Sequence, residues 1–218
     1  SGHAKNGRGW LQYFWISKGE LVFSLVRSFA LAGTTLIGLS LFSSAIFKWF
    51  PRTAQYWRFR RYLGVSGFVL VLFHALSVSY FYFKFDLKKT YYSLNPIENP
   101  IIFGSIALII FMVIALTSSD WMVNKLSAKK WKFIHRFVYI AYISAIFHFM
   151  LINPKMLKNL PGYLLLFVTL LALLGQIFWY FKIASRNKFK SKGALIGMLI
   201  IIGTIILGWI VYMQKVAP

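Results

Sequence analysis

Three histidines, His74, His135 and His148, lie within or at the start of long uncharged stretches, and they are the residues best suited to chemistry. Imidazole is a common axial ligand of haem iron and a common metal ligand in general. A proton-coupled transporter usually keeps a carboxylate inside its membrane-spanning helices. The acids all lie outside the uncharged stretches: Glu20, Asp86, Glu98 and Asp120. This pattern favours redox chemistry over transport.

Two of these histidines are predicted to lie at the same depth, on helices that run in the same direction. His74 follows Arg61 by 13 residues, and His148 follows Lys132 by 16. At 1.5 Å per residue these separations are roughly 20 and 24 Å. His135 is only three residues beyond Lys132. Because two axial imidazoles must reach one iron at the same level, His74 and His148 are the predicted haem ligands.

Small residues accompany both histidines and allow two interpretations. Gly67 precedes His74 by seven residues, and three small residues precede His148 within two helical turns: Ala141, Ser144 and Ala145. They could leave room for the edge of a porphyrin. Alternatively, they let transmembrane helices approach closely, with the histidines forming hydrogen bonds across the interface.

A basic cluster near His135 suggests a second functional region. Arg60 and Arg61 open the second uncharged stretch, while Lys132 and Arg136 flank His135. Such a cluster suits haem propionates, a flavin phosphate or a quinone head group. It equally fits topology signals and contact with anionic lipid. His135 could therefore bind a second haem, contact FMN or a quinone, or be an interfacial histidine without a role.

These residues must be positioned by membrane-spanning helices. Of the 218 residues, 59% are hydrophobic and 13% are charged, whereas a soluble domain has about 25% charged residues. About 20 helical residues cross a hydrocarbon core of about 30 Å. Six uncharged runs have about this length: 28–47, 62–83, 99–119, 137–154, 159–181 and 193–214. The predicted fold class is an all-α integral membrane protein, a bundle of six transmembrane helices.

The net charge of +21 is explained by membrane topology, so nucleic acid is not an expected partner. The loops after the first, third and fifth runs hold fourteen basic residues, and the opposite side holds nine. The richer side is predicted to be cytoplasmic, with both termini outside. Arg27 belongs to the predicted first span, directly before its uncharged run, and no span contains an acid that could pair with it. It could extend to the membrane surface or pair with a propionate.

The predicted organisation has three parts. Residues 1–20 form an N-terminal interfacial segment, 21–184 a haem-binding transmembrane core, and 185–218 an additional C-terminal transmembrane helix. The chain has no cysteine, which excludes iron–sulfur clusters, haem thiolates and covalent haem attachment. No glycine-rich nucleotide-binding motif follows a strand. Electrons are therefore expected from a separate cytoplasmic flavoprotein or a quinol.

Several motifs resemble the ferric-reductase-like transmembrane domain family. They are Arg-Arg-Tyr-Leu-Gly at 60–64, Leu-Phe-His at 72–74, Ala-Leu-Thr-Ser at 115–118, Trp-Lys-Phe-Ile-His-Arg-Phe-Val-Tyr at 131–139, and His148. The resemblance implies haem b held by His74 and His148, with His135 as the third histidine of the haem domain. It also implies that electrons enter from the cytoplasm and leave outward. Members with two bis-histidine haems carry a histidine where this chain has Arg60.

The predicted function is that of a multi-pass cytochrome b of a bacterial inner membrane. It would pass electrons to an outward-facing partner, as the electron-transfer subunit of an oxidoreductase and not as a complete enzyme. One bis-histidine haem b is expected, with a second haem, FMN or a quinone on the cytoplasmic side. The alternative is a non-catalytic anchor or assembly subunit that keeps a vestigial haem fold.

Overall fold

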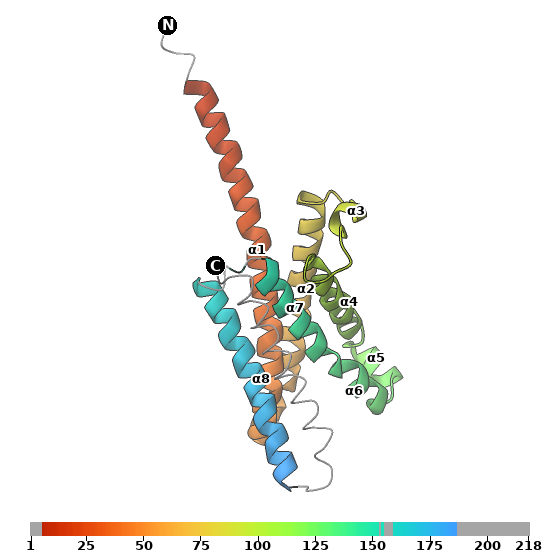
Figure 1. The fold of residues 1–218 in the computed structure, drawn as a ribbon. Helices are drawn as coiled ribbons and strands as arrows, with labels where there is room; N and C mark the ends of the chain where they lie inside the picture. Colours follow the sequence, from red (N-terminus) through yellow and green to blue (C-terminus); the bar gives the residue numbers. More distant parts are fainter. Residues whose placement is uncertain (1–5, 153, 155–158, 187–218) are drawn as a thin grey trace.

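The computed structural model describes residues 6–152, 154 and 159–186, and within these ranges the chain is helical, without β-strands (Figure 1). The helices are α1 (Asn6–Trp49), the 3-10 helix η1 (Pro51–Tyr56), α2 (Trp57–Phe81), α3 (Leu87–Thr90), α4 (Ile101–Leu116), α5 (Asp120–Lys125), α6 (Ala128–Arg136), α7 (Val138–Ile152) and α8 (Leu160–Arg186). The all-α prediction is confirmed for this part of the chain.

Among the described residues, four stretches of helix are long and apolar enough to cross a membrane: Glu20–Trp49, Pro51–Phe81, Ala128–Ile152 and Leu160–Trp179. The first lies within α1, the second joins η1 to α2, the third joins α6 to α7, and the fourth lies within α8. The chain is therefore a multi-pass membrane protein.

The predicted count of six spans is not confirmed. The run at 99–119 forms α4, which has 16 residues and a length of roughly 24 Å, short of a core of about 30 Å. Pro100 marks the start of this helix, and the Thr117 and Ser118 hydroxyls bond back to carbonyls of its last turn. The sixth run, 193–214, lies outside the described residues.

The first helix is continuous from Asn6 to Trp49, so no helix break marks the predicted boundary at residue 20. The interfacial placement of residues 1–20 and the division into three parts stay predictions. The helix ends before Pro51, because proline disfavours helical conformation in the residue that precedes it.

α1 is the central helix, with α2 along one side and α8 along another, while α4 packs against α7 (Figure 1). The buried core joins four helices, and its members are Ile37 and Leu41 of α1, Ala107 and Phe111 of α4, Ala141 and Tyr142 of α7, and Ala172 of α8. Of the small residues that precede His148, Ala141 is thus part of this core and Ala145 packs against it, while Ser144 is buried.

α1 and α2 approach each other closely at two glycines. A β-carbon on Gly67 would lie 2.7 Å from the carbonyl oxygen of Gly33, and one on Gly33 would lie 2.7 Å from that of Gly67. The space beside Gly67 is therefore taken by α1, not by a porphyrin edge. For this residue the close-packing interpretation is correct.

Candidate functional site

The ring of His74, on α2, is held by the backbone of α1. Its Nδ1 lies 2.9 Å from the carbonyl oxygen of Val26. A carbonyl oxygen can only accept a hydrogen bond, so Nδ1 carries the hydrogen and donates it. Val26 is buried, which places this bond at the interface of the two helices.

The ring of His148, on α7, is held in the same way by α4. Its Nδ1 lies 2.9 Å from the carbonyl oxygen of Pro100, at the start of α4. Gly104 makes the approach feasible, since a β-carbon there would lie 2.9 Å from the same Nδ1. Both predicted haem ligands therefore donate from Nδ1 to a backbone carbonyl of a neighbouring helix.

This tautomer leaves Nε2 of each ring with a lone pair. Neither Nε2 has a protein partner among the described residues. Both rings are half-buried.

These features fit a haem iron. Metal-bound histidines usually donate their other ring N–H to a carbonyl or carboxylate, which fixes the tautomer and the ring plane. No group of three or more His, Cys, Asp or Glu residues that could hold a bare ion occurs in the described ranges. A porphyrin would provide four equatorial nitrogens, so two imidazoles are enough for an octahedral iron.

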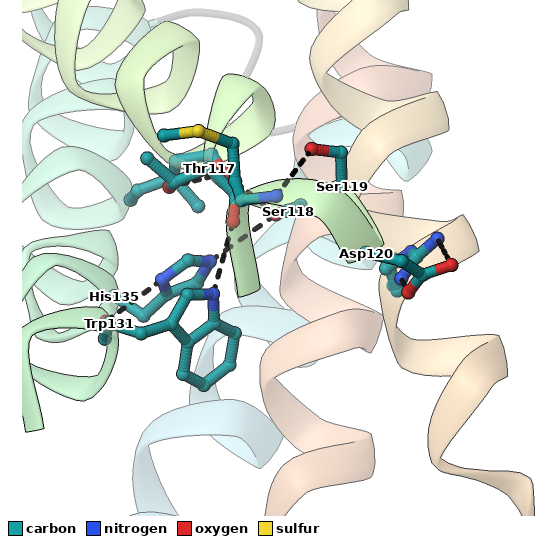
Figure 2. A network of polar contacts seen from close by, with 9 residues as sticks. Thr117, Ser118, Ser119, Asp120, Trp131 and His135 are labelled. Carbon is teal, nitrogen blue, oxygen red and sulfur yellow. Dashed lines mark hydrogen bonds and ion pairs between the residues drawn. The ribbon is translucent and has the colours of Figure 1, made fainter. Parts of the chain in front are cut away.

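His135, on α6, has a different environment. Its Nδ1 lies 3.1 Å from the carbonyl oxygen of Trp131, and its Nε2 lies 3.3 Å from Oγ of Ser118. The ring stacks on the Trp131 indole, with centroids 3.9 Å apart (Figure 2). Because both nitrogens face protein oxygens, this ring offers no free nitrogen for iron in the observed arrangement.

The turn after α4 connects three helices through four consecutive residues (Figure 2). The carbonyl of Thr117 accepts from the indole Nε1 of Trp131 at 3.1 Å, and Ser118 faces the imidazole of α6. Ser119 caps α5 by accepting from the backbone of Met122. Asp120 forms an ion pair with Arg61 at the start of α2.

The two adjacent arginines have separate environments. Arg61 pairs with Asp120, with Nη2 donating to Oδ2 at 3.3 Å, and this hydrogen bond lowers the pKa of Asp120. Arg60 is half-buried, and its carbonyl accepts from the hydroxyl of Ser40 at 2.8 Å. Its charge acts on His135. The structure thus pairs Arg61 with Asp120, whereas Arg60 acts on His135 through its charge and not through a hydrogen bond among the described residues.

Lys48 and Gln176 form a further polar contact at this end of the bundle, and the sequence analysis did not identify it. Nζ of Lys48 donates to Oε1 of Gln176 at 2.9 Å, across the interface of α1 and α8. Nε2 of Gln176 donates to the carbonyl of Leu41 at 3.2 Å and to Oγ of Ser44 at 3.3 Å. The charges of Lys48 and Arg60 also interact, which extends the basic region of the site towards α8.

Fold and site together define a class: an α-helical, multi-pass membrane protein with a pair of intramembrane imidazoles suited to haem. The family model described as "Ferric reductase like transmembrane component" matches residues 29–146. This range is more than half of the chain and includes His74 and His135. The chain belongs to the ferric-reductase-like transmembrane family, as its motifs indicate.

Curated relatives carry the name protein-methionine-sulfoxide reductase heme-binding subunit MsrQ. The chain is 29% identical to the MsrQ protein of Herminiimonas arsenicoxydans over 133 residues, and this alignment covers 60% of the chain and 59% of the relative. It is 27% identical over 146 residues to that of Polaromonas naphthalenivorans (strain CJ2), covering 66% and 65%. With the Brucella ovis protein it shares 32% identity over 95 residues, covering 43% and 42%.

These relatives confirm a likeness, also indicated by the motifs between residues 60 and 148, to haem-binding subunits of methionine-sulfoxide reductase systems. The chain spans less than two thirds of the length of each of the three. No solved structure matches it significantly.

Proposed function

We propose that this chain is a cytochrome b subunit that conducts electrons across a bacterial inner membrane, with haem b bound between His74 and His148. The observation that carries this proposal is the pair of equivalent bonds from Nδ1 to Val26 and Pro100, each 2.9 Å long. The naming of the relatives as haem-binding subunits supports the same cofactor. Haem, when bound, supplies one-electron chemistry.

The protein itself contributes orientation and a low dielectric. Each carbonyl holds its imidazole in one tautomer and one ring plane, so that Nε2 of each ring would be available as a ligand of the iron. Phe103 of α4 and Phe147 of α7 stack beside this region with centroids 5.6 Å apart. Such apolar packing excludes water and thereby influences the reduction potential.

On the cytoplasmic side, we propose an electron entry site formed by Arg60 and His135, with Arg61 at its rim. The charge of Arg60 acts on His135. Arg60 lies in the first turn of α2, and His135 lies near the junction of α6 with α7. The two ring nitrogens of His135 already face oxygens, which favours contact with FMN or a quinone over ligation of a second haem. The donor would be a cytoplasmic flavoprotein or a quinol.

The proposed acceptor is an outward-facing reductase on a separate chain. The relatives are named as subunits of a protein-methionine-sulfoxide reductase. A catalytic subunit that reduces methionine sulfoxide is therefore the partner class to test first. In this scheme the chain is the electron-transfer subunit and the partner performs the chemistry on the substrate.

Haem content and absorbance spectra of histidine variants test the proposal. Purified wild-type protein should contain about one haem b per chain and show a low-spin reduced-minus-oxidised spectrum. H74A and H148A should each abolish that spectrum, because each removes an axial ligand. H135A is the matched control and should retain most of the haem. An unchanged spectrum in both H74A and H148A would rule out the assignment.

A further inference from the structure

Arg27 lies beside the carbonyl that holds His74. Val26, the acceptor of that hydrogen bond, is the preceding residue on α1. The guanidinium carbon of Arg27 lies 3.5 Å from the ring centroid of Phe23, one turn nearer the outer end of the helix. Phe23 in turn packs against Tyr82, just beyond α2, with centroids 5.9 Å apart. The cation therefore lies beside the middle of α1 and close to the end of α2, near the carbonyl of Val26 that holds His74.

This cation has no acidic partner in the described part of the chain. The ion pairs there are Arg61 with Asp120 and Lys89 with Asp86. Arg27 is only partly exposed, and charged side chains in membrane helices usually pair with another group or face a functional site. The charge acts on the Tyr82 hydroxyl, where it opposes the rise in pKa that burial causes. The guanidinium thus lies on the side of α1 where Phe23 contacts Tyr82.

We propose that Arg27 binds a propionate of the haem held by His74 and His148, an inference that rests on the proposed function. The propionates are the charged groups of haem b, and they extend beyond the ring edge towards water. A guanidinium on the residue next to Val26, whose carbonyl holds His74, would be available to bind one of these carboxylates. Arginine binds carboxylates with two parallel hydrogen bonds, which would fix the rotation of the porphyrin about the axial bonds.

The second consequence is electrostatic. A positive charge near the haem favours the reduced state of the iron, since reduction adds an electron. The cation–π contact with Phe23 would keep the guanidinium in place when the propionate is protonated or absent. Arg27 is therefore a binding residue that also raises the reduction potential.

Redox titration of full-length variants tests this inference. R27Q should retain the haem and its low-spin spectrum, with the equilibrium constant for reduction about tenfold lower, a shift of ~59 mV for one electron. R27K restores the charge and should recover part of the shift. K88Q is the matched control, since it removes an exposed positive charge on the same side of the membrane at a distance from the site. It should leave the potential unchanged.

Each other outcome is also decisive. A wild-type potential in R27Q, or an equal shift in K88Q, would overturn the propionate contact. If R27Q loses haem, recovery of haem binding in R27K would support the contact between Arg27 and the propionate. Equal loss of haem in R27K would overturn that contact and would indicate that Arg27 acts by packing against Phe23. Wild-type protein without haem would overturn the proposed function itself, whereas a haem-loaded wild type with an unshifted R27Q would overturn only this inference.

Discussion

The imidazole of His148 lies directly over Gly104. A β-carbon on this glycine would be 2.9 Å from Nδ1 and 3.1 Å from Cε1 of the ring. The same Nδ1 donates to Pro100, one turn earlier on α4. One helix thus supplies both the hydrogen-bond acceptor and the space that the ring needs to reach it.

Replacing Gly104 by alanine should weaken haem binding. The added methyl group would displace the ring and disrupt its bond to Pro100, and loss of such an outer contact typically costs roughly 10–100-fold in metal affinity. Haem titration of the apoprotein would measure this loss. G64A is a suitable control. Its new β-carbon would lie 3.2 Å from Oγ of Ser40, between α1 and α2, whereas Gly104 and His148 lie between α4 and α7. Equal affinity in G104A and wild type would contradict the prediction.

Replacing Gly67 by alanine should destabilise the protein. The new β-carbon would lie 2.7 Å from the backbone oxygen of Gly33, and backbone cannot rotate away. Forcing an extra methyl into a close-packed interface costs about 1–3 kcal/mol. Thermal unfolding in detergent should show the loss, and the exposed neighbour Ser66, changed to alanine, should not. A G67A protein as stable as S66A would mean that α1 and α2 can separate freely.

Removal of Gln176 should destabilise the contact between α1 and α8. Gln176 is only 2% exposed, and Q176L would leave the ammonium of Lys48 without its acceptor. Interhelical polar contacts in membranes contribute roughly 1–2 kcal/mol, so a loss of this size is expected. The double variant K48M/Q176L removes both partners and should recover part of the stability. The stability lost in the double variant should therefore be smaller than the sum of the losses in K48M and Q176L. If it equalled that sum, Lys48 and Gln176 would not be coupled.

The ion pair of Asp120 with Arg61 should make stability depend on pH. The hydrogen bond from Arg61 lowers the pKa of Asp120, whose ordinary value is about 4. The stabilisation is therefore complete above about pH 4 and disappears as the pH falls through the lowered pKa. D120N should unfold at a lower temperature than wild type at neutral pH, and the two should converge in acid.

The effect should be small and should disappear at high salt, because the Asp120 side chain is 78% exposed. E20Q changes another exposed carboxylate and serves as the control. A difference between D120N and wild type that persists at low pH would assign the effect to the α5 N-terminus and not to the ion pair.

Much of the site could be predicted from residue types. His74 and His148 stand out because an ionisable residue inside an uncharged run is costly and therefore informative. Arg60 and Arg61 could not be separated in this way. Successive helical residues point about 100° apart, so adjacent arginines reach different neighbours. Only the folded chain shows that Asp120 binds the second arginine and that the first lies near His135.

The prediction for Gly67 illustrates the opposite case. A glycine near a histidine is compatible with a cofactor or with a second helix, and the sequence contains no information on which of them fills the space. The structure places Gly33 there. The length of α4 was similarly hidden, since the uncharged run at 99–119 is longer than the helix that forms within it.

By itself, the sequence determined that this is a helical membrane protein with an imidazole pair in its spans, because hydrophobic length and charge placement follow from residue types alone. Tertiary structure decided which nitrogen of each imidazole is free. The deciding partners, Val26 and Pro100, each lie 48 residues from their histidine and act through backbone carbonyls. Every residue has a backbone carbonyl, so the packing of the helices decides which carbonyl accepts the hydrogen bond. Residue types therefore cannot predict this partner.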